Sequence, residues 1–271
     1  MKRKTFTERF PFLLPVRKLQ RNLFFYTKMH FDENKYSLEK EELLKFKIFT
    51  TKTDMINKDS GFPIEYQINK VHNLKLASKN INRVIIKPNE MFSFWKLVRG
   101  ADKHEKYKDG LSLIDGEIVG SYGGGLCQLS NMLFLMFLNT PLTIVERHSH
   151  RVQKIPARER VIGIDSSVAE GWLDLKVRND TQINFQIDIE FDKEYMYGSI
   201  YSDTESRLCY EIYNMDVEYI KNGDQIVEKS KVYKKTTDKI NKQVQVEFLY
   251  ENKTEIGYKL PNYIEKIERG A

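Results

Sequence analysis

A cysteine follows three consecutive glycines in the segment SYGGGLCQLSN (residues 121–131), and an apolar run begins directly after it. If that run is a helix, Cys127 lies in its first turn, where unpaired backbone N–H groups and the positive end of the helix dipole favour a thiolate over a thiol. Glycines also let the backbone approach a ligand closely and point N–H groups at an anion. The segment therefore indicates a cysteine nucleophile beside an oxyanion-binding loop.

A base for this nucleophile is offered by the segment ERHSH, residues 146–150. In a strand, alternation places Glu146, His148 and His150 on one face and Arg147 on the other. Asp174 belongs to the next predicted strand, on the face opposite its leucines, and is a candidate carboxylate to orient a histidine. The order of the three groups along the chain is then Cys, His, Asp.

Two other interpretations of the same residues stay open. His148, His150 and the Cys127 thiolate, with Glu146 as a substitute ligand, would supply three metal ligands and leave a fourth position for water. Alternatively, the cysteine is a core residue of an apolar helix and the histidines are solvated, which is the usual situation for such residues. The HSH spacing alone is weakly specific, whereas a glycine loop, a helix-start cysteine and an HSH strand in succession are more specific.

These residues must be positioned by the elements around them. The run from Leu126 is apolar on nearly every side and stops at Asn139 before a proline, which predicts a buried helix of about 13 residues. The pair Asp115-Gly116 joins two short apolar runs and predicts a β-hairpin that leads into the glycine loop. The residues from Thr143 onward are β-rich and alternating, and they predict the strand that carries the histidines.

The remaining chain has helices early and strands late. Helices are predicted over residues 37–50 and 64–80, with a short strand over 84–86. Alternating, tyrosine-rich strands with Asn, Asp and Gly turns follow Trp172, and Cys209 is predicted to be a small packing residue in one of them. The pattern predicts an α+β fold, an antiparallel sheet with a buried central helix and a β-rich C-terminal half. The predicted parts are a basic N-terminal extension (1–36), a core domain (37–182) and a β-rich C-terminal portion packed on the core (183–271).

The positive charge of the chain is concentrated at the N-terminus. Residues 1–28 carry a net charge of +7 against +6 for the whole chain, so the remainder carries −1. A near-neutral body argues against a nucleic-acid-binding face. The two prolines of FPFLLPV (residues 10–16) are expected to interrupt any helix there, which predicts a solvated or loosely docked extension. The alternative is peripheral contact of this arm with an anionic inner membrane surface.

The cysteines indicate a reducing compartment. Cys127 and Cys209 lie far apart and form no CxxC pair, and no export signal or spanning segment of about 18 apolar residues is found. We therefore expect a cytoplasmic protein with a free Cys127 thiol, possessing no cofactor. The sequence leaves the oligomeric state undetermined.

Residues 70–181, with the strings GGGLCQLSN and ERHSH, resemble the VanW family, which takes its name from an accessory protein encoded with B-type vancomycin resistance genes. The family pattern favours His150 over His148. Where it commonly has a serine after that histidine, this sequence has Arg151. Other positions that match the pattern are Phe92, Ser93, Phe94, Trp95, Gly123, Gly124, Gly125, Cys127, Gln128, Ser130, Glu146, Arg147, Asp174 and Asn179.

The resemblance implies a link to glycopeptide resistance or cell-envelope metabolism. Together with the residue chemistry it yields a hypothesis of thiol-dependent acyl transfer or amide hydrolysis on a peptidoglycan-related ligand. The alternative from another class is a non-enzymatic protein that binds such a ligand. The candidate catalytic residues are Cys127, His150 and Asp174, with His148 and Glu146 as further candidates. The candidate ligand-binding residues are Gly123, Gly124, Gly125, Gln128, Ser130, Trp95 and Arg147.

Overall fold

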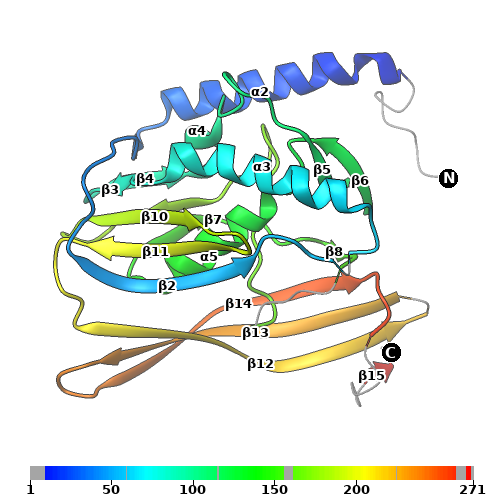
Figure 1. The fold of residues 1–271 in the computed structure, drawn as a ribbon. Helices are drawn as coiled ribbons and strands as arrows, with labels where there is room; N and C mark the ends of the chain where they lie inside the picture. Colours follow the sequence, from blue (N-terminus) through cyan, green and yellow to red (C-terminus); the bar gives the residue numbers. More distant parts are fainter. Residues whose placement is uncertain are drawn as a thin grey trace.

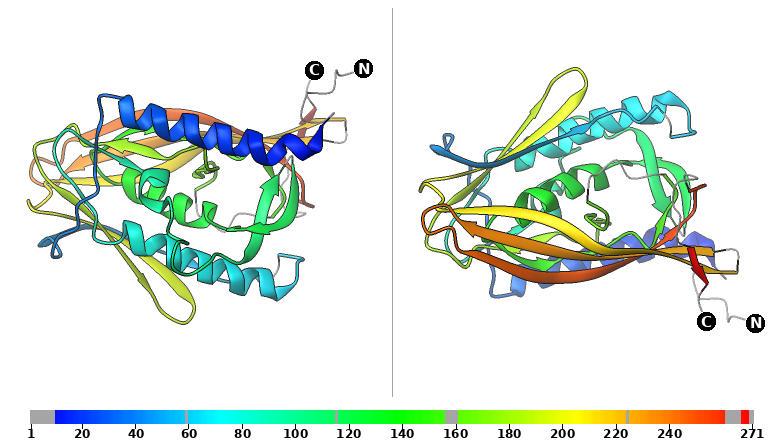
Figure 2. Two further views of the ribbon diagram at one scale, coloured as in Figure 1. Left: turned by 90° about the horizontal axis from the view of Figure 1, so that it is seen from above. Right: turned by 90° about the horizontal axis from the view of Figure 1, so that it is seen from below.

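A computed structural model describes residues 10–58, 60–114, 116–155, 161–223, 225–260 and 267–269. Its two central helices form where the apolar pattern predicted them. α3 spans Ile64–Ile81, and α5 spans Cys127–Leu138. Most side chains of α5 after its first turn are fully buried, and the helix lies in the middle of the molecule (Figure 2). The prediction of a buried central helix is confirmed.

An antiparallel sheet flanks α5 in the strand order β2-β11-β10-β3. Its strands are β2 (Phe46–Asp54), β11 (Tyr195–Ser202), β10 (Phe185–Phe191) and β3 (Ile85–Ile86). Gly198 of β11 permits close packing, because a Cβ there would overlap the sulfur of Met136 on α5. This sheet joins strands from before and after residue 182, so the N-terminal and C-terminal halves of the chain share one core.

Two smaller sheets carry the segments that precede and follow α5. One has the order β1-β4-β9-β7, from β1 (Lys35–Tyr36), β4 (Glu90–Ser93), β9 (Lys176–Arg178) and β7 (Thr143–Glu146). The short helix α4 (Phe94–Val98) continues directly from β4. The other is the hairpin of β5 (Asp109–Ile114) and β6 (Glu117–Tyr122), at the position predicted from the Asp-Gly pair.

The late strands form a separate layer at the bottom of the view in Figure 1. The order is β15-β12-β13-β14-β8, from β15 (Ile267–Arg269), β12 (Leu208–Asn222), β13 (Gln225–Asp238), β14 (Val244–Ile256) and β8 (Val152–Gln153). These elements confirm the α+β class and the β-rich C-terminal half. Cys209 is exposed on β12, so the prediction that it is a packing residue is wrong.

The helix predicted over residues 37–50 is absent. The chain there forms an irregular segment followed by β2, whose burial alternates along FKIFTTKTD. β2 pairs with β11 along its whole length. The leucines and glutamates of this segment favour a helix locally. The period-two pattern and the pairing with a strand 141 to 156 residues later in the chain outweigh that preference.

The strand predicted from Thr143 is shorter than expected. β7 ends at Glu146 after an irregularity in its pairing with β9, and residues 147–151 belong to no strand. The alternation that placed Glu146, His148 and His150 on one face therefore does not apply. The chain turns instead toward β8, which pairs with the end of β14.

The N-terminal arm is helical rather than interrupted by its prolines. A short 3-10 helix, η1 (Pro11–Leu13), leads into α2 (Leu14–Phe31). Pro15 occupies the first turn of α2, where a missing N–H costs no hydrogen bond and a fixed φ suits the helix. α2 runs along the top of the molecule, on the far side from β12–β14 (Figure 1), and buries Tyr26 and Met29. No described helix is long and apolar enough to cross a membrane.

Candidate thiol site

Cys127 is the first residue of α5, and α3 holds the loop in front of it. The buried amide of Asn73 donates to the carbonyl oxygens of Lys108 at 2.8 Å and Gly124 at 3.0 Å. Its own oxygen accepts from the backbone N–H of Lys108 at 2.8 Å. One side chain of α3 thereby joins the start of the hairpin to the glycine loop and sets where α5 begins.

The glycines before Cys127 permit close contact between chain segments. Gly123 and Gly125 have φ values of 72° and 96°, in the left-handed region that favours glycine. A Cβ on Gly124 would overlap the backbone of Gly110, and one on Gly125 would overlap the side chain of Lys70. The space beside these two glycines is thus filled by the protein itself. The predicted use of this loop to bind a ligand stays a prediction.

The Cys127 thiol is partly exposed and lies within hydrogen-bonding reach of His150, Ser167 and the Val168 carbonyl. It donates to the carbonyl oxygen of Val168 at 3.8 Å and it interacts with the ring of His150. Burial raises the pKa of Cys127, but the hydrogen bond and positive charge of His150 outweigh burial, and the net effect is a pKa below the ordinary value of a thiol. The position at the start of α5 favours the thiolate in the same direction.

His150 is held by Asp165 rather than by Asp174. Asp165 Oδ2 accepts from the backbone N–H of His150 at 2.6 Å and from the ring Nδ1 at 2.9 Å. With Nδ1 engaged, the other ring nitrogen is left for the thiol. Burial lowers the pKa of His150, yet the hydrogen bonds to Asp165 and Cys127 raise it to about 10. Both shifts favour the ion pair of imidazolium and thiolate over the neutral pair.

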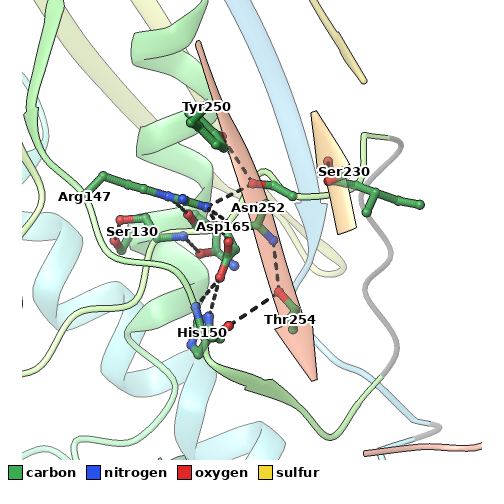
Figure 3. A network of polar contacts seen from close by, with 12 residues as sticks. Ser130, Arg147, His150, Asp165, Ser230, Tyr250, Asn252 and Thr254 are labelled. Carbon is green, nitrogen blue, oxygen red and sulfur yellow. Dashed lines mark hydrogen bonds and ion pairs between the residues drawn. The ribbon is translucent and has the colours of Figure 1, made fainter. Parts of the chain in front are cut away.

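Arg147 fixes the Asp165 carboxylate from the other side (Figure 3). Its Nη2 donates to Asp165 Oδ1 at 2.5 Å, and its Nε donates to the backbone oxygen of the same residue at 2.6 Å. The guanidinium also contacts the rings of Tyr250 and Phe134, 4.6 and 5.2 Å from their centroids, and donates to Asn252. Arg147 thus ties the site to β14. This contact set gives Arg147 a structural role at the site, and its predicted role in ligand binding stays a prediction.

The first turns of α5 hold the segment that carries Asp165. The backbone N–H of Ser166 donates to Asn131 Oδ1 at 2.7 Å, and Ser130 Oγ donates to Ser166 Oγ at 2.9 Å. Ser130, predicted to bind ligand, is fully buried in this contact. Because one helix bears Cys127 and anchors the Asp165 segment, the thiol and the carboxylate have a common support. The sequence analysis missed Asp165, because its segment is irregular and shows no hydrophobic periodicity.

Asp174 occupies the core behind β4. Its carboxylate accepts from Ser93 Oγ at 2.6 Å and from the backbone N–H groups of Trp95 and Leu175 at 3.1 and 2.9 Å. Burial raises its pKa to about 6, although these hydrogen bonds lower it. The structure therefore corrects the predicted orienting role of Asp174: this carboxylate organises the junction of β4 and α4.

The other predicted candidates are distributed around the site. His148 Nε2 lies 3.0 Å from Glu146 Oε1, and Glu146 Oε2 pairs with Lys176 at 2.8 Å. Trp95 is buried and donates from its ring to the Leu173 carbonyl. Gln128 donates to the Asp54 carbonyl at 2.7 Å and so anchors α5 to β2. Among the described residues, no three His, Cys, Asp or Glu side chains converge to hold a metal ion, and His148 faces Glu146 instead of Cys127.

An open cleft of about 450 Å³ lies over His150. It is lined by the turn after β7 and by the segment before β9, including Arg147, His148, His150, Arg151, Ser167 and Trp172. Ser167 also contacts the Cys127 thiol, so two residues of the lining reach the sulfur. Trp172 is 65% exposed. His150 thus lines the cleft, and it contacts the Cys127 thiol.

Comparisons with known proteins agree over this region. The family model described as "VanW like protein" matches residues 69–201, which include Cys127, His150 and Asp165. The chain is 42% identical over 269 residues to Vancomycin B-type resistance protein VanW of Enterococcus faecalis (strain ATCC 700802 / V583), over 98% of each chain. It is 34% identical over 110 residues to the uncharacterized protein YoaR of Bacillus subtilis (strain 168), over 40% of this chain and 35% of that one. No solved structure matches.

Proposed function

The chain belongs to the VanW family, and from that premise we propose that it is an accessory protein of vancomycin resistance with a thiol centre for acyl transfer or amide hydrolysis. The resistance role is supported by the Enterococcus faecalis relative, which is named a vancomycin B-type resistance protein and aligns with this chain over nearly its whole length. The chemistry is supported by one observation above all. A helix-start cysteine contacts a histidine that a partly buried carboxylate holds in place.

The proposed reaction begins with attack of the Cys127 thiolate on the carbonyl carbon of an amide. The C–N bond then breaks, and the leaving nitrogen takes the proton of the His150 imidazolium, which leaves a thioester and a free amine. In the second half, water or an acceptor amine attacks the thioester while the neutral imidazole accepts its proton. The C–S bond breaks, and the thiolate and the imidazolium are restored. Asp165 stabilises the imidazolium and orients its ring throughout.

The proposed substrate is a peptidoglycan-related amide that enters the open cleft. The cleft combines the exposed indole of Trp172 with the exposed side chain of Arg151, which suits a peptide bearing a carboxylate. The assignment of this substrate rests on the family relationship together with that lining.

The thiol itself supplies the first test. We expect iodoacetamide to alkylate Cys127 well below pH 8.5, the ordinary pKa of a free thiol. The Cys209→Ser variant, which removes the exposed second thiol, should keep this reaction, and Cys127→Ser should lose it. A Cys127 that reacts only as an unperturbed thiol would contradict the proposed chemistry.

A second experiment tests function in cells. A B-type resistant strain that lacks its own VanW is complemented with the wild type, Cys127→Ser or Cys209→Ser, and the minimal inhibitory concentration of vancomycin is measured. We expect the wild type and Cys209→Ser to complement equally and Cys127→Ser to fail at the same protein level. Full complementation by Cys127→Ser would favour the alternative of a non-enzymatic protein that binds an envelope ligand.

A further inference from the structure

The outward face of α2 is apolar. Its inward face buries Tyr26 and Met29 against the body of the protein, while five apolar side chains on the rest of the helix are each more than 60% exposed. These are Val16, Leu19, Leu23, Phe24 and Phe31. Phe12 of η1 extends the same surface at 73% exposed. In the described chain no other element covers it (Figure 1), and a row of this length is unusual on a free protein surface.

Positive charge accompanies this apolar face. Arg17, Arg21 and Lys28 follow one another at intervals of four and seven residues, which places them in one stripe along the helix. Lys18 adds a fourth positive charge, and residues 10–31 contain no aspartate or glutamate. The helix thus presents apolar side chains flanked by cations, with no acidic residue to offset them.

From this combination we infer that α2 docks the protein on an anionic membrane surface. An amphipathic helix of this kind lies in the interface plane, with apolar side chains among the upper acyl chains and Lys and Arg beside lipid phosphates. A second copy of the chain is a poorer occupant, since pairing two α2 faces would bring two clusters of like charge together. Charge complementarity therefore selects the lipid surface.

The inward face of α2 lies against the loop that forms one rim of the cleft. Tyr26 Oη donates to Glu170 Oε1 at 2.9 Å, and a Cβ on Gly171 would overlap the side chain of Asn22. Trp172, at the rim, comes next in the chain. Docking of α2 would hold this rim about one helix diameter, ~10 Å, from the bilayer. The cleft would then lie close to ligands that are attached to the membrane. This consequence rests on the proposed function, but the docking of α2 does not.

Vesicle sedimentation of the full chain tests the inference. We expect binding to vesicles of phosphatidylglycerol and phosphatidylcholine that is at least about tenfold stronger than to phosphatidylcholine alone and that weakens with salt. Leu23→Glu with Phe24→Glu should abolish it. The matched control, Ile240→Glu with Val244→Glu, makes the same charge change at exposed apolar positions near the turn between β13 and β14 and should bind as the wild type does.

Charge is tested separately. Arg17→Gln with Arg21→Gln should weaken binding to the anionic vesicles about tenfold, whereas Lys193→Gln with Lys242→Gln, at exposed sites elsewhere, should have a small effect. Equal binding to both vesicle types, or wild-type binding by the Leu23 and Phe24 variant, would overturn the inference. The inference would also be overturned if the wild type bound no vesicles but formed a dimer in sedimentation velocity, and the Leu23 and Phe24 variant were a monomer. The rate of Cys127 alkylation is measured on the same variants. It reports on the thiol centre alone, so a failure of membrane binding can be told apart from a failure of the proposed chemistry.

Discussion

Asp165 Oδ2 accepts two hydrogen bonds from His150, one from the backbone N–H at 2.6 Å and one from the ring Nδ1 at 2.9 Å. The same carboxylate therefore fixes the position of the residue and the orientation of its imidazole. Arg147 occupies the other oxygen, so Asp165 has little freedom to turn away. This relationship makes Asp165 the carboxylate on which the electrostatics of the thiol depend.

Replacing Asp165 with Asn should shift the thiol reactivity to higher pH. Without the carboxylate the pKa of His150 falls, because less negative charge stabilises the imidazolium, and the thiolate loses its counter-ion in turn. We expect the midpoint of the pH profile of Cys127 alkylation to rise by about one unit. Asp174→Asn, the matched change at the other carboxylate, should leave the pH profile unchanged. The reverse ranking of the two variants would contradict the assignment.

Asp174 should make stability depend on pH. Burial raises its pKa to about 6, above the value of about 3.9 in an unfolded chain. The folded state then binds more protons between pH 4 and 6, so the stabilisation from the protonated carboxyl is complete below pH 4 and is lost as the pH rises through 6. The unfolding free energy of the wild type, relative to Asp174→Asn, should fall by about 3 kcal/mol over this range. Denaturant titrations at several pH values measure it, and parallel curves for the two proteins would refute it.

Arg147→Lys should destabilise the protein. Lysine cannot reproduce the fork that joins Asp165, Gly163 and Asn252, and it loses the stacking on Tyr250. With the side chains of Arg147 and Asp165 only 12% and 20% exposed, we expect a loss of about 3 kcal/mol in unfolding free energy.

The control for this change is Arg178→Lys at an exposed ion pair with Asp180, where the loss should be much smaller because solvent screens the pair. Equal losses in the two variants would show that the buried network adds nothing to stability. The comparison uses denaturant midpoints at one pH and salt concentration.

Gly124→Ala should disturb both folding and the thiol. A Cβ at this position overlaps the backbone of Gly110, which cannot move without shifting the hairpin, so we expect a loss of about 2 kcal/mol or more. Gly61→Ala is the comparison, because Gly61 has φ of 77° but open space around its Cβ, and strain alone should cost about 1 kcal/mol. Only Gly124→Ala should slow Cys127 alkylation, and normal alkylation in a destabilised variant would show that the loop does not position the thiol.

Local patterns were sufficient for the elements nearest Cys127. The apolar run of α5 and the Asp-Gly hairpin follow from neighbouring residues, and both appear where they were predicted. Residues 37–50 show the opposite case, since their local preference for a helix is outweighed by pairing of β2 with β11. The alternating pattern also predicted too long a strand for β7. β7 ends where its pairing with β9 ends, and β9 is a short strand from later in the chain.

The sequence by itself determined that Cys127 begins a buried helix and that histidines follow it, because helix amphipathicity and turn chemistry act over a few residues. Only the tertiary structure decided which carboxylate serves His150. Asp174 had the strand context that the pattern favoured, yet its hydrogen bonds are satisfied by Ser93 and Trp95. Asp165 comes to His150 because α5 holds its segment by hydrogen bonds between residues that lie 35 and 36 positions apart. Such contacts depend on three-dimensional packing, and the hydrophobic periodicity of the sequence does not predict them.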